Sequence, residues 1–185
     1  LVSMASHTKS IVDYGLEGIT IDIECHLSNG LPTVTIVGLA GKALDESKER
    51  LRVAIASSGA TFPRKKIIIN LAPAELPKDA VSLDLAIAAA ILKADGQIPA
   101  KLTDSIFIGE LGLDGDVRPV RGIIGKLLNK QCRAATAVFI PKDNVAQASL
   151  TGLETIYPVS SLQELINHLA GSALIQPIEP SAVQS

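Results

Sequence analysis

The chain has 185 residues, which is enough for one domain or at most two. Hydrophobic residues make up 47% of the sequence, but it holds only 2 Tyr, 3 Phe and no Trp, so its core must be aliphatic. A formal net charge of −2 excludes a protein whose overall field recruits nucleic acid or acidic lipid, and no apolar run approaches the roughly 18 residues of a membrane-spanning helix.

The first predicted elements are β-strands. Apolar and polar residues alternate strictly over residues 19–28, which predicts a half-buried strand. Asn29-Gly30 follows, the pair typical of a tight hairpin, and residues 33–36 alternate again. We therefore expect residues 33–36 to be the return strand of a hairpin, and an earlier strand at residues 10–14 to complete a meander.

Helical spacing begins at residue 43. Residues 43–57 carry an apolar stripe with acidic residues in the first turn, and Gly59 is a typical helix stop. Residues 66–71 (KIIINL) form a short apolar run, which predicts a central strand. Residues 82–94 (SLDLAIAAAILKA) are helical in spacing and nearly all apolar, which predicts a buried helix.

The rest of the chain predicts a second hairpin and then alternating helices and strands. Residues 106–113 and 116–119 flank Asp114-Gly115, a second hairpin signal. Three further elements are expected: a helix at 122–133, a strand at 137–140 and a helix at 161–170.

Both ends of the chain are expected to lie outside the fold. Met4 is the only methionine, so we interpret residues 1–3 as an expression-vector remnant and residues 1–8 as a lead-in to the domain. Residues 171–185 contain two prolines and no periodicity, which is typical of a linker. No signal-peptide pattern is seen, so we expect a cytoplasmic protein.

Three segments resemble the N-terminal domain of the YifB/ComM family, the Mg-chelatase-like (ChlI-related) AAA+ ATPases. They are HLSNGLPTVTIVGLAGKALDESKERLRVAIASSGATFPRKKIIINLAPAELPKDAVSLDLAIAAAIL (26–92), IGELGLDGDVRPVRGIIGKLL (108–128) and VFIPKDNVAQASL (138–150). The phrases NLAPAELPK and SNGLP are specific. The resemblance runs over residues 9–170, which it identifies as one domain.

The resemblance implies a fold and a place in a larger protein. The fold would be α+β in two layers, similar to the proteolytic domain of Lon and to domain two of ribosomal protein S five, with a mixed sheet and helices mainly on one face. An AAA+ module would follow the linker at 171–185. No GxxxxGK[ST] occurs in the chain, so ATP and magnesium would bind in that missing module.

The same resemblance implies a function. The ComM members are hexameric helicases that promote branch migration in natural transformation. We therefore expect a non-catalytic domain that aids hexamer assembly or engages DNA. Its partners would be its own AAA+ module, neighbouring protomers and DNA, with no role at a membrane.

Two residues lie where Lon-type domains carry catalytic groups. Those domains place a nucleophilic serine in a PKDGPSAG stretch and a lysine base on the helix after a GE hairpin. By this resemblance Ser82 of PKDAVSLD (77–84) holds the nucleophile position, and Lys126 of GIIGKLL (122–128) holds the position of the base. A Ser–Lys peptidase needs the lysine desolvated and within hydrogen-bond reach of the serine.

The alternative for Ser82 and Lys126 is structural, and we favour it. A serine before an apolar helical run is the usual N-cap, with Asp84 adding to the first-turn dipole. Lys126, Lys130 and Arg133 share one helical face, which predicts a solvated surface. Around Ser82, side chains larger than those of Lon would obstruct a peptide.

Basic residues form the second set of candidates. Taken segment by segment they predict solvated faces, and Glu46–Arg50 has the spacing of an ordinary i,i+4 ion pair. No aromatic residues lie between them, so any DNA contact would be to phosphate. The candidates are Arg64, Lys65, Lys66, Arg118, Arg121, Lys130 and Arg133.

The sequence predicts neither a disulfide nor a metal site. Cys25 and Cys132 lack CxxC spacing, so we expect two buried thiols. His7, His26 and His168 lie far apart and fall in no ligand motif, which favours surface positions.

Overall fold

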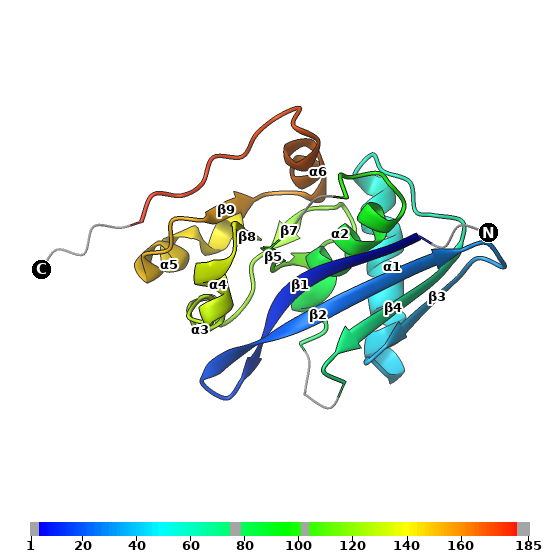
Figure 1. Ribbon diagram of the computed structural model, residues 1–185, viewed down its shortest axis with the longest axis horizontal. Helices are drawn as coiled ribbons and strands as arrows, with labels where there is room; N and C mark the ends of the chain where they lie inside the picture. Colours follow the sequence, from blue (N-terminus) through cyan, green and yellow to red (C-terminus); the bar gives the residue numbers. More distant parts are fainter. Residues whose placement is uncertain (1–3, 75–78, 101–103, 181–185) are drawn as a thin grey trace, which may run out of the picture.

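A seven-stranded mixed sheet organises the chain in the computed structural model, which describes residues 4–74, 79–100 and 104–180 (Figure 1). The strand order is β3-β4-β2-β1-β5-β8-β9. The strands are β1 (Met4–Tyr14), β2 (Glu17–Ser28), β3 (Thr33–Val37), β4 (Lys66–Ala72), β5 (Ser105–Phe107), β8 (Ala137–Pro141) and β9 (Ile156–Val159). A separate two-stranded ribbon pairs β6 (Glu110–Leu111) with β7 (Val117–Arg118).

Helices cover the sheet unequally. One face is covered by the longer helices α1 (Gly41–Ser57), α2 (Asp84–Ala94) and α6 (Leu162–Ala170), whose buried residues share one core. The opposite face is covered over β5, β8 and β9, and where α3 meets β1 and β2, by the short helices α3 (Ile123–Leu127), α4 (Lys130–Ala134) and α5 (Val145–Ala148). The described residues also form three 3₁₀ turns: η1 (Val81–Leu83), η2 (Lys142–Asn144) and η3 (Ser149–Thr151). The predicted two-layer fold, with helices mainly on one face, is confirmed.

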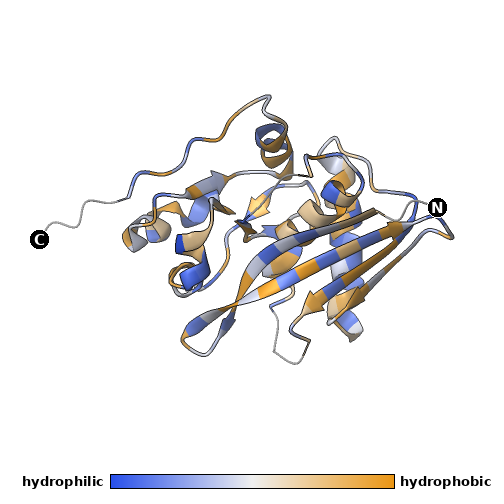
Figure 2. Cartoon of the chain, viewed as in Figure 1, coloured by the Kyte–Doolittle hydropathy of each residue, from blue (hydrophilic) through white to orange (hydrophobic). Residues whose placement is uncertain are grey.

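The long hairpin of β1 and β2 shows why alternation predicts a strand. Ile21, Ile23, Cys25 and Leu27 are fully buried on the helix-covered face, and Figure 2 shows hydrophobic and hydrophilic residues alternating along β2. The turn follows Tyr14, which pairs with Glu17.

The start of β1 was not predicted. The inward side chains there are Ser6, Thr8 and Ser10, so no apolar alternation marks the strand. The Ser6 hydroxyl donates to the Ala90 carbonyl at 2.5 Å and the Thr8 hydroxyl donates to the Ala86 carbonyl at 2.8 Å. Residues 4–8, expected as a lead-in, therefore belong to the sheet and hold α2 close to it.

The predicted hairpin across Asn29-Gly30 is wrong. Strand β4 lies between β2 and β3, antiparallel to β2 and parallel to β3. The reason is the β3–α1–β4 crossover, which makes these two strands parallel neighbours. The apolar strand β4 takes an inner position and the short β3 takes the edge.

Two other predicted elements are divided. The strand expected at 106–113 splits after Phe107, because β5 joins the large sheet and β6 joins the ribbon. The helix expected at 122–133 breaks before α4, where the Asn129 side chain accepts from the Gln131 N–H and donates to the Gly18 carbonyl at 2.7 Å. Strand β9 and helix α5 were not expected.

The described part of the predicted linker lies against the domain. The Ile178 N–H donates to the Ile156 carbonyl at 2.8 Å, and the Ile175 N–H donates to Nδ1 of His168 at 2.9 Å. Both isoleucines pack on the cores. The tail is therefore anchored to the edge strand β9 at Ile178 and to α6 at Ile175. Within the part of the chain that the structure describes, no helix is long and apolar enough to span a membrane.

Candidate functional site

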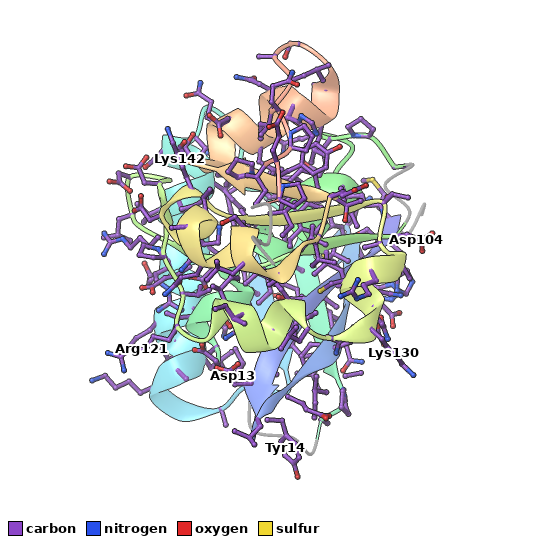
Figure 3. The ribbon with its side chains drawn as sticks, turned by 90° about the vertical axis from the view of Figure 1, so that its left-hand side faces the viewer. Asp13, Tyr14, Asp104, Arg121, Lys130 and Lys142 are labelled. Atoms are coloured by element: carbon purple, nitrogen blue, oxygen red, sulfur yellow. The ribbon has the colours of Figure 1, made fainter. Side chains whose placement is uncertain are left out.

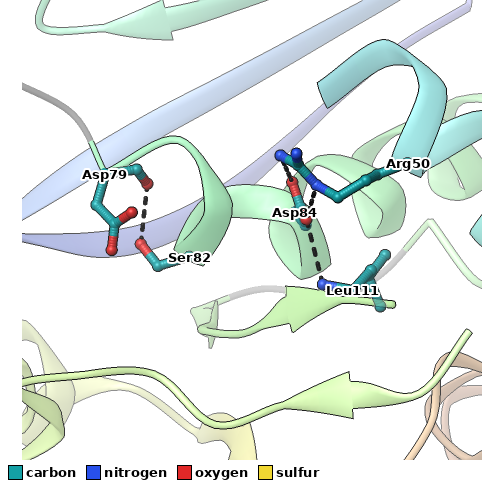
Figure 4. Close-up of polar contacts among 5 residues, drawn as sticks. All are labelled: Arg50, Asp79, Ser82, Asp84 and Leu111. Carbon is teal, nitrogen blue, oxygen red and sulfur yellow. Dashed lines mark hydrogen bonds and ion pairs between the residues drawn. The ribbon is translucent and has the colours of Figure 1, made fainter. Parts of the chain in front are cut away.

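Ser82 lies in the 3₁₀ turn η1, directly before α2. Its side chain is 1% exposed, and its Oγ donates to the Asp79 carbonyl at 3.0 Å (Figure 4). Leu83, not Ser82, is the N-cap residue of α2, and no side chain caps that helix. The predicted N-cap role of Ser82 is therefore wrong, because the chain enters the helix through a turn that already has helical dihedral angles.

Lys126 is buried completely. Its Nζ donates to the Arg121 carbonyl at 2.7 Å and forms an ion pair with Oδ2 of Asp13 at 3.0 Å. Lys130 and Arg133 are exposed on α4, as expected. The prediction that Lys126 shares their solvated face is wrong, because the break before α4 separates the two helices.

Ser82 and Lys126 have separate partners. Among the described residues no hydrogen bond joins the Ser82 Oγ to the Lys126 Nζ. The elements that carry them also pack on opposite faces of the sheet: Leu83 joins the core under α1 and α2, whereas Ile123 and Leu127 of α3 join the other core. The Lys126 Nζ is therefore bound to other oxygens and makes no contact with the Ser82 hydroxyl that would let it act as a base there.

The most completely buried charged group near Ser82 is one that the sequence did not single out as a site. Asp84 is 0% exposed and binds Arg50 through two contacts, Nε to Oδ2 at 2.9 Å and Nη2 to Oδ1 at 3.2 Å. The Leu111 N–H also donates to Oδ2 at 3.2 Å (Figure 4). Burial raises the pKa of Asp84 to about 6, although Arg50 and the Leu111 N–H act to lower it.

This pairing corrects the predicted Glu46–Arg50 ion pair. The Arg50 guanidinium points to Asp84, and Glu46 is paired with Lys42 at 3.6 Å. Bidentate binding to a buried carboxylate is stronger than an exposed i,i+4 pair. The signal in the sequence was an aspartate inside the otherwise apolar run SLDLAIAAAIL.

A cavity of about 550 Å³ lies beside the Arg50–Asp84 pair. It is bounded by α1 and by the β6–β7 ribbon, and its carboxylates outnumber its arginines. The lining residues are Asp45, Glu46, Glu49, Arg50, Glu110, Leu111, Gly112, Leu113 and Arg118. Arg118, one of the predicted DNA contacts, therefore lies among acidic groups that oppose the approach of phosphate.

The remaining basic candidates do not gather on one surface. Arg64 and Lys65 precede β4, Lys66 begins it, and Lys65 is paired with Asp95 at 3.5 Å. Figure 3 shows Arg121 and Lys130 on opposite sides of the face formed by α3 and α4. Arg133 lies on α4 with Lys130. DNA contact by these residues stays a prediction.

The cysteines are buried and free, as predicted. Burial raises the pKa of both Cys25 and Cys132 to about 12, so they are neutral thiols at physiological pH. In residues 4–74, 79–100 and 104–180 no group of three or more His, Cys, Asp or Glu side chains could hold a metal ion.

The histidines occupy different settings. His7 is exposed, and His26 interacts with Glu24 on the sheet face that lacks helices. His168 is half-buried and packs edge-on against Phe139.

This chain is similar to one protein family and to several individual proteins. The family model described as subunit ChlI of Mg-chelatase matches residues 23–144. YifB of Salmonella typhimurium, an uncharacterized protein, is 39% identical over 174 residues, which cover 93% of this chain and 34% of that protein. Competence protein ComM of Haemophilus influenzae is 38% identical over 158 residues, which cover 85% and 31%.

A more distant similarity links the chain to Lon. The Lon protease of Brevibacillus choshinensis is 27% identical over 163 residues, which cover 82% of this chain and 21% of the protease. The chain thus spans about a third of the length of its YifB and ComM relatives and a smaller share of Lon.

Proposed function

This chain belongs to the family of the Mg-chelatase subunit ChlI, and we propose that it is a non-catalytic domain of a YifB/ComM-like AAA+ ATPase that processes DNA. The relatives are about three times as long as the chain, which leaves room for an ATPase module outside it. The chain has no GxxxxGK[ST] loop, so ATP and magnesium would bind in that module.

The contacts of Ser82 and Lys126 support a domain without catalytic activity. Ser82 and Lys126 are both buried, but each is hydrogen-bonded to a different backbone carbonyl, and Lys126 is also paired with Asp13. A Ser–Lys mechanism needs a neutral lysine that accepts the serine proton. We infer that these contacts of Ser82 and Lys126 stabilise the fold instead.

The same geometry favours protein contacts over DNA contacts. The basic candidates are dispersed, Lys65 is neutralised by Asp95, and Arg118 lies among carboxylates. A protein that binds nucleic acid electrostatically needs its cations on one face. We therefore favour a role in assembling a hexameric ring over a role in binding DNA directly.

Isothermal titration calorimetry with Mg-ATP tests the assignment. The 185-residue chain should show no binding heat, whereas the full-length protein should bind and hydrolyse ATP. Ser82→Ala in the full-length protein should leave hydrolysis within about twofold of the wild type. Measurable affinity of the 185-residue chain for ATP would refute the proposal.

A Ser–Lys peptidase is the second candidate. It is favoured by the similarity to Lon and by the complete burial of Lys126, since a catalytic lysine must be desolvated. Lys126 would have to leave Asp13, and the Ser82 Oγ would have to turn from the Asp79 carbonyl. Cleavage of casein that is lost in a folded Ser82→Ala variant would support this candidate, and no cleavage by the wild type would count against it.

A further inference from the structure

The two edges of the large sheet differ in how they are protected. At one end β9 carries Pro158, and the Ile178 N–H donates to the Ile156 carbonyl, so the tail bonds to that edge. At the other end β3 has β4 on one side, and no strand among residues 4–74, 79–100 and 104–180 pairs with its outer side. We call this outer side the β3 edge.

The β3 edge lacks the features that usually prevent strand pairing. Its sequence, TVTIV (33–37), contains only β-branched residues, with no charge, no proline and no bulge against β4. Alternate residues of an edge strand direct their N–H and C=O groups outward, where only water or another strand can satisfy them. Val34 and Ile36 are buried beneath α1 and Val37 is 48% exposed, so the edge is ordered and partly apolar.

The surroundings of the edge are basic at one end. A hollow of about 180 Å³ opens beside Thr33 and Val34, and Arg52, Arg64 and Lys65 line it. Lys65 is paired with Asp95, while Arg52 stacks on the Phe62 ring at 5.3 Å. Among the described residues, Arg52 and Arg64 have no carboxylate partner. Two cations without counter-charges therefore lie at the start of β3.

From these observations we propose that the β3 edge binds an extended segment of a partner protein by adding a strand to the sheet. The segment pairs antiparallel with β3, because antiparallel pairing is the more stable per residue. Its carboxyl-terminal end then lies at the start of β3, beside Arg52 and Arg64. The segment fitted by this surface has β-branched residues followed by acidic ones, and this inference does not depend on the ATPase role proposed above.

The test uses a labelled ten-residue peptide of alternating threonine and valine that ends in aspartates and glutamates. Its binding is measured by fluorescence anisotropy, together with hydrogen exchange of the amides of residues 33–37. We expect saturable binding and slower exchange at β3. A peptide with lysines and arginines in place of the acids should bind roughly tenfold more weakly.

Two controls separate strand addition from simple charge attraction. N-methylation of alternate peptide amides removes strand pairing without altering the protein, and it should abolish binding. Arg64→Glu should weaken binding by roughly five- to tenfold, whereas Arg133→Glu, an exposed arginine on α4, should change it less than about twofold.

Three outcomes would overturn the proposal. One is no binding of the acidic peptide at millimolar concentration. Another is equal binding of the N-methylated peptide, which would reduce the site to a charged surface. The third is binding of single-stranded DNA, weakened by Arg64→Glu, without binding of the peptide, which would make the hollow a phosphate contact.

Discussion

The two halves of the sheet differ in how helices cover them and in the length of their strands. In the open half (β3, β4, β2 and β1) helices cover one face, the strands are long or strictly alternating, and the other face carries mainly polar residues and is covered only where α3 meets β1 and β2. In the closed half (β5, β8 and β9) helices lie on both faces and the strands are only three to five residues long. Neighbours such as Ile106 and Phe107 thus enter different cores.

The two halves therefore differ in the surface that they offer to partners. Among the described residues the edge of the open half at β3 has no strand partner, whereas at the edge of the closed half the tail bonds to β9 through Ile178. Two polar junctions hold separate elements of the fold together. At one, Arg50 of α1 and Asp84 of α2 meet the Leu111 N–H of the ribbon; at the other, Asp13 of β1 meets Lys126 of α3.

Breaking the first junction should have the largest effect. Asp84→Ala leaves Arg50 partly buried without its carboxylate and should lower the free energy of unfolding by about 3–5 kcal/mol. Urea denaturation measures this. Glu46→Ala on the exposed side of α1 is the control and should change stability by less than about 0.5 kcal/mol. An equal loss in both variants would show that the junction does not hold α1, α2 and the ribbon together.

The junction between Asp13 and Lys126 can be tested by adding a methyl group at the neighbouring Gly18. A Cβ at Gly18 would lie 2.6 Å from Cγ2 of Ile11 and 2.9 Å from the Lys126 Cα. Gly18→Ala should therefore cost about 1–3 kcal/mol in thermal or urea unfolding. The matched control is Gly125→Ala in α3, where the nearest atom would be 3.7 Å away. It should be neutral or stabilising, and an equal cost at both glycines would contradict the close approach of β2 to α3.

The first junction also predicts a pH dependence. The pKa of Asp84 is about 6 in the folded chain and near its ordinary value when unfolded. Folding therefore takes up a proton between about pH 4 and 6, so the contribution of Asp84 to stability is present below pH 4 and is lost as pH rises through 6, by on the order of 2 kcal/mol. Comparison with Asp84→Asn across this range measures it. If both variants show the same slope, the assignment is wrong.

The smallest effect is expected at Ser82. Ser82→Ala removes one hydrogen bond to the Asp79 carbonyl and should cost about 1 kcal/mol. The exposed Lys130→Ala is the control, with an expected change below about 0.5 kcal/mol. A loss far above 1 kcal/mol would mean that Ser82 supports the turn before α2 through more than this bond.

Sequence reasoning succeeded where burial on one face imposes a period. The alternation of residues 19–28 and the apolar helix at 82–94 were predicted because each residue's environment follows from its spacing. Sequence reasoning failed where the pairing of strands depends on segments that are far apart in the chain. Asn29-Gly30 signals a turn but cannot report that β4 will insert beside β2, and the hydroxyls of Ser6 and Thr8 concealed the start of β1.

The candidate site was harder to predict than the fold. The resemblance to Lon singled out Ser82 and Lys126, but which groups they contact depends on tertiary packing. The burial of Lys126 depends on a helix break at Asn129 that periodicity does not show. The Arg50–Asp84 pair joins residues 34 positions apart, and no local rule reports such a contact.

Covalent labelling with a fluorophosphonate probe, measured by intact mass spectrometry, tests whether Ser82 and Lys126 form a catalytic dyad. Wild-type chain, Ser82→Ala and Lys126→Ala are compared in parallel, with folding of each checked by circular dichroism. We expect no adduct on any of the three proteins, because Ser82 is bound to the Asp79 carbonyl and Lys126 to Asp13. A single adduct on the wild type that is absent from both folded variants would contradict it and establish a Ser–Lys dyad.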